Sequence, residues 1–281
     1  MMRFSVLLLF IALHAPSLSY SQQPAASAPP EDSLQPAPVF NWDYIHSGFM
    51  DARDQALAPL HWNGIQWLTC GALAATESAL VFGGGDKNIQ IWAQANRNNT
   101  SNLIERYAGD PFGNGLYPAI LMGSAYFTGL LLHRDKPKRF AMLCAKSFIL
   151  SGITAGVIKN IAGRYRPYQD NPPNPLQWKG PAAFLKDNSF PSGHTTIAFS
   201  TATMLALEYP RPLIIPIAAY TLASITALGR INGNYHWGSD VLMGAATGYF
   251  TSRLVFNHNN WGKLQKRHRN SKHGDVWHTV F

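Results

Sequence analysis

Six apolar segments follow one another along the chain after residue 60. They cover residues 65–82, 117–132, 140–158, 194–209, 213–228 and 241–256. Each is about as long as a helix, is rich in Ala, Leu, Ile and Gly, and lacks the strict apolar–polar alternation of a half-buried strand. Residues 87–108 are more polar and predict a shorter amphipathic helix. The pattern therefore predicts an all-α fold, a helical bundle of about six apolar helices.

Breaks in the pattern divide the chain further. The start, residues 1–21, has a basic residue, a short apolar core and a small-x-small site, which is typical of a secretory signal peptide. Residues 22–40 are rich in Pro, Ala and Ser and predict a flexible linker. We expect the helical domain to cover residues 41–256, and a basic C-terminal tail to follow at 257–281.

The positions of basic residues predict how the chain would be oriented in a membrane. The apolar segments reach or fall just short of the ~20 residues that a span needs, so both a soluble bundle and a polytopic membrane protein fit. Basic residues gather in "HRDKPKR", 133–139, and in "GKLQKRHRNSK", 262–272. The positive-inside rule assigns both to the cytoplasmic face, which places residues 159–193 and 229–240 together on the exported face.

The number of crossings limits this arrangement. A cleaved signal peptide leaves the mature N-terminus outside, and six crossings would then place 133–139 outside as well. Five crossings, from residue 117 onward, remove the conflict if segment 65–82 does not span. That segment carries Glu77 in its middle, so we expect it to be packed or interfacial.

The composition indicates which classes of partner this chain would bind. Charged residues make up only 14% of the chain, and its net charge of +8 suits anionic partners such as phosphates or acidic lipids. The basic residues are scattered and form no long stripe, so nucleic acid is not expected. No Cys or His spacing resembles a metal site, and no cofactor is expected.

Three short motifs gather chemistry on the face predicted to be exported. They are "KNIAGRYRP" at 159–167, "PSGH" at 191–194 and "GRINGNYHWGSD" at 229–240. Each alone fits a helix end or a capped turn. Together they supply three cations, two imidazoles, a carboxylate and the start of a helix, which suit a phosphoryl group. The candidate residues are Lys159, Arg166, Ser192, Gly193, His194, Arg230, His236 and Asp240.

The three motifs resemble the signature of the type 2 phosphatidic acid phosphatase superfamily, K-x6-R-P, then P-S-G-H, then S-R-x5-H-x3-D. The resemblance implies that His236 is a nucleophile forming a phosphohistidine, and that Asp240 orients it. It implies that His194 protonates the leaving oxygen and then activates water. Lys159, Arg166, Ser192, Gly193 and Arg230 would hold the phosphoryl oxygens.

Two residues stand outside this pattern. Gly229 occupies the position where the family pattern has Ser, and we expect an effect on loop packing or substrate preference with the chemistry retained. Arg164 is not part of the signature. It would either reach the substrate or face solvent, and we expect it to face solvent.

The favoured function is therefore phosphatase activity on a lipid phosphate or diphosphate, in the inner membrane with the site facing the periplasm. A soluble periplasmic acid phosphatase acting on small phosphate esters keeps the same chemistry. A vanadium-dependent haloperoxidase and a non-catalytic binder of anionic lipid are the remaining alternatives. The oligomeric state is left open by the sequence.

The charge pattern generates a direct test of orientation. A reporter fused after Arg139 is expected to show a cytoplasmic location, because that position follows a cluster of basic residues. A periplasmic location would contradict the assignment of faces.

Overall fold

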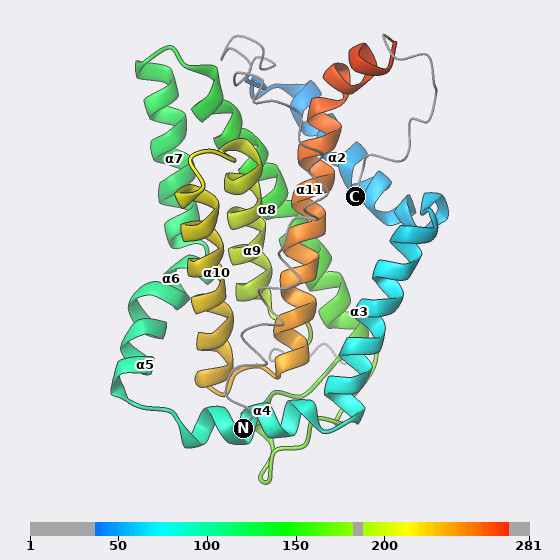
Figure 1. Ribbon diagram of the computed structural model, residues 1–281, viewed down its shortest axis with the longest axis vertical. Helices are drawn as coiled ribbons and strands as arrows, with labels where there is room; N and C mark the ends of the chain where they lie inside the picture. Colours follow the sequence, from blue (N-terminus) through cyan, green and yellow to red (C-terminus); the bar gives the residue numbers. More distant parts are fainter. Residues whose placement is uncertain (1–36, 182–187, 270–281) are drawn as a thin grey trace. The chain divides into compact units, whose positions relative to one another are not determined.

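The computed structural model describes residues 37–181 and 188–269, and it is helical over most of this length (Figure 1). The predicted signal peptide and most of the predicted linker lie outside the described residues. The α-helices are α2 (Trp42–Leu57), α3 (Gly64–Phe82), α4 (Gly85–Ala95), α5 (Asn99–Ile104), α6 (Asp110–Gly113), α7 (Leu116–Leu131), α8 (Asp135–Ala162), α9 (Gly193–Glu208), α10 (Ile214–Asn232) and α11 (Gly238–Arg269). Short 3₁₀ turns cover Ala58–His61 and Pro167–Gln169, and a π-helical turn covers Glu105–Gly109.

All six apolar segments are helices, as predicted: α3, α7, α8, α9, α10 and α11. The helix expected over 87–108 is instead two, because α4 ends at Ala95 and α5 starts at Asn99. Asn98 separates them: its side chain accepts a hydrogen bond from the backbone of Ser101 and caps the new helix. Helix α11 also continues to Arg269, into the predicted tail.

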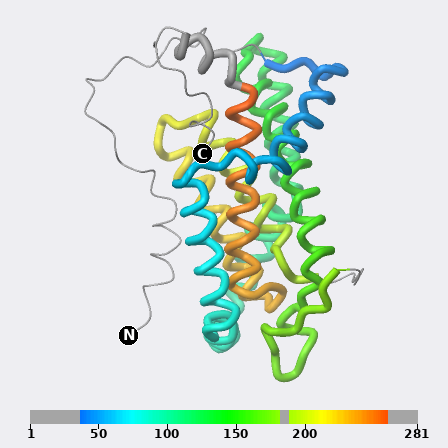
Figure 2. Tube along the Cα trace, turned by 90° about the vertical axis from the view of Figure 1, so that its right-hand side faces the viewer, coloured from blue at the N-terminus to red at the C-terminus, as the bar shows by residue number. Residues whose placement is uncertain are grey.

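Helix α9 lies at the centre of the bundle. It packs against α8, α10 and α11, and α6 contacts its first turns (Figures 1 and 2). Small residues allow this close packing: a Cβ added at Gly248 of α11 would lie 2.3 Å from the carbonyl oxygen of Thr196. Nearby, the hydroxyl groups of Ser147, Ser200 and Ser252 hydrogen-bond one another across α8, α9 and α11. Polar groups buried in this way are satisfied inside the bundle.

Within residues 37–181 and 188–269, three helices are long and apolar enough to cross a membrane by length and composition: α3, α8 and α10. Segment 65–82, which the sequence predicts not to span, is thus a candidate span. Its Glu77 is only 8% exposed, so this side chain faces protein rather than the outer surface of the bundle. Lys146 of α8 is also buried, and its charge is paired with Asp51 of α2 at a distance of 3.2 Å.

A crossing by α3 changes the count of spans. Helix α2 packs on α8 close to the basic turn at 133–139, where Tyr44 donates a hydrogen bond to the carbonyl of Met142. With α3 as a span, α2 and that turn share one membrane face. A cleaved signal peptide would place α2 outside, and Arg139 would then lie outside with it. The reporter at Arg139 therefore also tests whether the signal peptide is cleaved.

The close contact between α9 and α11 predicts a specific sensitivity to volume. Gly248→Ala should lower the free energy of unfolding by about 1–3 kcal/mol, because its methyl group has no space beside Thr196 and Ser200. Gly156→Ala is the matched control, since a Cβ at Gly156 meets nothing within 4 Å. Thermal unfolding of the purified proteins measures both, and equal unfolding temperatures for the two variants would contradict the packing.

Candidate active site

The candidate site forms where several helices end at one end of the bundle. Helix α8 stops at Gly163, which adopts a left-handed conformation with φ of 59°. Any side chain there would be strained, and a Cβ would also lie 2.7 Å from the carbonyl oxygen of Gly180. The reversal directs the next residues, Arg164 and Arg166, back across the ends of the helices.

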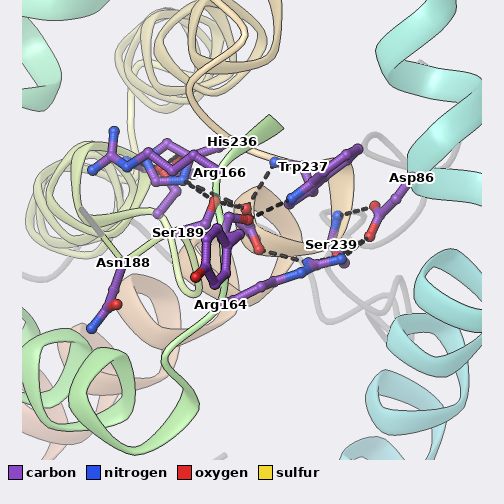
Figure 3. Close-up of polar contacts among 12 residues, drawn as sticks. Asp86, Arg164, Arg166, Asn188, Ser189, His236, Trp237 and Ser239 are labelled. Carbon is purple, nitrogen blue, oxygen red and sulfur yellow. Dashed lines mark hydrogen bonds and ion pairs between the residues drawn. The ribbon is translucent and has the colours of Figure 1, made fainter. Parts of the chain in front are cut away.

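Arg164 does not face solvent, as the sequence suggested, but is fully buried. One guanidinium nitrogen donates to Asp240 Oδ1 at 2.7 Å, and the other donates to Asp86 Oδ2 at 2.7 Å. Further hydrogen bonds reach the hydroxyl of Ser239 and the carbonyl of Pro175. Figure 3 shows this line of contacts from Asp86 through Arg164 toward His236. Arg164 can be buried because the N–H groups of its guanidinium all have hydrogen-bond partners.

Asp86 was missed by sequence reasoning because it reads as an ordinary acidic residue in the first turn of a helix. It is fully buried, and its two oxygens accept hydrogen bonds from the backbone and the hydroxyl of Ser239. Asp86 thereby fixes α4 against the start of α11.

His236 and Asp240 lie together at the junction of α10 and α11. His236 Nδ1 is 3.6 Å from Asp240 Oδ2, which is longer than a hydrogen bond. Ser189 fills the gap: its hydroxyl hydrogen-bonds Asp240 Oδ2 and lies 3.3 Å from His236 Nδ1. Asp240 Oδ2 also accepts from the backbone N–H of Trp237 at 2.8 Å, which caps the start of α11. Ser189 is a second residue that no motif indicated.

Burial controls the protonation of His236, which is only 2% exposed. Loss of hydration is the largest of the effects that together lower the pKa of His236 to about 3. The positive charges of Lys159 and Arg166 act in the same direction, and Asp240 opposes them. The imidazole is therefore neutral at pH 7. Because its Nδ1 faces Ser189 and Asp240, the second nitrogen, Nε2, is the one available for chemistry.

The predicted phosphate-binding residues surround this histidine. Lys159, in the last turn of α8, donates to the carbonyl oxygens of Asn188 at 2.9 Å and Ser189 at 3.3 Å. Its side chain also comes close to Gly193, where a Cβ would lie 3.8 Å from Lys159 Cε. The positive charge of Arg166 acts on both Lys159 and His236, and Figure 3 draws Arg166 in the same site. Lys159 and Arg166 therefore lie close to the start of α9.

Ser192 and Gly193 form the start of α9. Ser192 is the N-cap, and its hydroxyl oxygen accepts hydrogen bonds from the backbone and the side chain of Thr195. Gly193 is the first helical residue and is partly exposed. The start of a helix presents free N–H groups to an anion.

His194 and Arg230 complete the set from α9 and α10. Both contact a residue that the sequence did not single out, Asp110 of α6: His194 Nε2 lies 3.2 Å and Arg230 Nη1 lies 3.0 Å from Asp110 Oδ1. Arg230 Nη1 is also 3.6 Å from Glu105, a buried residue whose pKa is raised by desolvation, against the lowering effect of Arg230. The structure thus brings all eight sequence-predicted residues into one cluster and adds acidic partners.

Packing explains the glycine at position 229. A Cβ there would lie 3.0 Å from Glu105 Cγ and 3.3 Å from Glu105 Cβ. A serine would therefore require Glu105 to move, which agrees with the expected effect on packing.

Residues 140–262 match the family model described as the PAP2 superfamily, and this range contains all three motifs. This region of the chain belongs to the PAP2 superfamily.

Relatives fall into two groups by name. A lipid A 1-phosphatase of Porphyromonas gingivalis is 49% identical over 77 residues, which cover 25% of this chain and 17% of that protein. A lipid A 1-phosphatase of Rhizobium etli is 27% identical over 213 residues, covering 71% of this chain and 85% of that protein. An undecaprenyl-diphosphatase of Sulfolobus acidocaldarius is 28% identical over 140 residues, covering 50% and 65%. The first and third matches span less than two thirds of those relatives.

The burial of Arg164 predicts that its charge is needed for folding. Arg164→Gln should lower the free energy of unfolding by about 3–5 kcal/mol, because Asp86 and Asp240 would stay buried without their shared cation.

Arg53→Gln is the matched control for that variant. Arg53 pairs with Asp54, but its side chain is 58% exposed, so the change should stay within about 1 kcal/mol. Thermal unfolding compares the two variants, and a small effect of Arg164→Gln would show that the network is not structural.

Proposed function

We propose that this chain is a membrane-embedded phosphatase that removes phosphate from a lipid phosphate or diphosphate through a phosphohistidine at His236. The observation that carries the proposal is a buried, neutral imidazole held beside Asp240 and surrounded by three cations and a second histidine. This arrangement suits phosphoryl transfer, which needs positioning and charge stabilisation.

The first step forms the covalent intermediate. His236 Nε2 attacks phosphorus and forms the P–N bond while the bond to the leaving oxygen breaks. Lys159, Arg166 and Arg230, together with Ser192 and the N–H of Gly193, hold the phosphoryl oxygens. His194 gives its proton to the leaving oxygen. Asp240 stabilises the positive charge that develops on His236.

The second step releases phosphate. His194, now neutral, takes a proton from water, and the resulting oxygen attacks phosphorus. The P–N bond breaks, its electron pair returns to His236, and the starting state is restored. Arg164 takes no proton in either step and holds Asp240 in place.

The exposed surface supports a lipid substrate. Helix α8 carries a row of apolar side chains one turn apart, Ile149, Ile153, Val157 and Ile161, each more than half exposed. The row leads to the end of α8, where Lys159 belongs to the cation cluster. Contiguous apolar surface of this kind fits a bilayer better than water, and an acyl or prenyl tail could lie along it.

The relatives support the substrate class. Two of them are named lipid A 1-phosphatases and one an undecaprenyl-diphosphatase, so a lipid A phosphate and a prenyl diphosphate are the substrates to test first. The basic turn at 133–139 lies at the other end of α8 from Lys159, which supports a site on the exported face.

Phosphate release tests the proposal. Membrane and soluble fractions containing the full chain are given a lipid A 1-phosphate, undecaprenyl diphosphate and p-nitrophenyl phosphate, with His236→Ala as the inactive variant. We expect release from a lipid in the membrane fraction, and a fall of at least about 1,000-fold in His236→Ala, because the covalent route is lost.

His46→Ala is the matched control, since His46 is an exposed histidine of α2 and should leave the rate unchanged. Activity confined to the aryl phosphate in the soluble fraction would favour the periplasmic acid phosphatase. Oxidation of bromide only after addition of vanadate would favour the haloperoxidase, and no release from any substrate would contradict the proposal.

A further inference from the structure

Asp110 lies inside the cluster although no motif contains it. It is the first residue of α6, directly after the π-helical turn Glu105–Gly109. A single oxygen, Oδ1, contacts both His194 Nε2 at 3.2 Å and Arg230 Nη1 at 3.0 Å. The other oxygen, Oδ2, is 3.3 Å from the side-chain amide of Asn114. The carboxylate therefore joins the residue assigned to the leaving group with one assigned to the phosphoryl oxygens.

The backbone that carries Asp110 has little freedom. The hydroxyl of Thr226 donates to the carbonyl oxygen of Gly109 at 3.0 Å. A Cβ at Gly113 would lie 2.8 Å from His194 Cβ and 2.6 Å from Thr226 Cγ2, so α6 lies directly on α9 and α10. A carboxylate supported in this way holds its partner in one orientation rather than sampling several.

We infer that Asp110 is a positioning residue, which holds the His194 ring by accepting from its Nε2 so that the Nδ1 proton is directed to the leaving oxygen. The inference rests on the proposed function. When the P–O bond breaks, its electron pair stays on the leaving oxygen, which takes the Nδ1 proton of His194, while His236 forms the P–N bond. Burial and the charge of Arg230 lower the pKa of His194 to about 4, and Asp110 opposes them. The carboxylate, together with the negative charge of a bound phosphate ester, therefore favours the charged imidazole before the transfer, and it keeps the neutral one in place afterwards.

The role predicts dependence on the leaving group. A poor leaving group, such as the alkoxide of dodecyl phosphate, needs a proton as the bond breaks. A good one, such as dinitrophenolate, leaves without that help. Loss of a positioning residue for the proton donor should therefore slow the first ester much more than the second, whereas general damage to the site slows both equally.

The experiment measures kcat/KM of the detergent-solubilised full chain for dodecyl phosphate and for 2,4-dinitrophenyl phosphate. Asp110→Asn should lower the value for dodecyl phosphate by about 10- to 100-fold and the value for dinitrophenyl phosphate by less than about 3-fold. Asp110→Glu should recover part of the loss. Asp43→Asn, which removes an exposed carboxylate from α2, should change neither value.

Several outcomes would overturn the inference. Equal losses on both esters would mean that Asp110 only supports the structure. Unchanged or increased values in Asp110→Asn would mean that the carboxylate is idle or obstructs the anion site. A wild-type chain that releases phosphate from neither ester would instead overturn the proposed function and, with it, the role of Asp110.

Discussion

The buried guanidinium of Arg164 is the interaction on which the rest of the site depends. It joins α4, through Asp86, to the first turn of α11, through Asp240, and to the loop after α8, through the carbonyl of Pro175. Two buried carboxylates without this cation would be strongly unfavourable. With it, they become fixed acceptors, and Asp240 has a remaining oxygen for Ser189 and the region of His236.

Burial then determines the protonation state of His236. The imidazole of His236 stays neutral because it is buried, so its free nitrogen keeps the lone pair that a nucleophile needs. The cations stand around it at helix ends, where the end of α8 provides Lys159 and the start of α9 provides free N–H groups. The proposed anion site thus lies at helix ends that the packing of α9 holds together.

The sequence predicted the six apolar helices and the eight cluster residues, because apolar runs and short motifs are local signals. It did not predict Asp86, Asp110 or Ser189, whose partners lie far away in the chain and whose surroundings read as a helix start, a turn and a loop. The prediction that Arg164 faces solvent is wrong for the same reason, because its two acidic partners, Asp86 and Asp240, lie far from it in the sequence. Glu77 looks from the sequence like an obstacle to spanning, but its side chain is buried against protein, and a sequence does not show which way a side chain faces.

The central claim is that His236 becomes covalently phosphorylated, and trapping the intermediate tests it most directly. The full chain is mixed with a ³²P-labelled aryl phosphate, quenched within milliseconds in alkali, and digested, and the labelled peptide is identified by mass spectrometry. A base-stable, acid-labile label on the peptide containing His236 is predicted, and it should be absent from His236→Ala. A label on His194, or phosphate release by an active enzyme without any label under conditions that preserve phosphohistidine, would contradict the account.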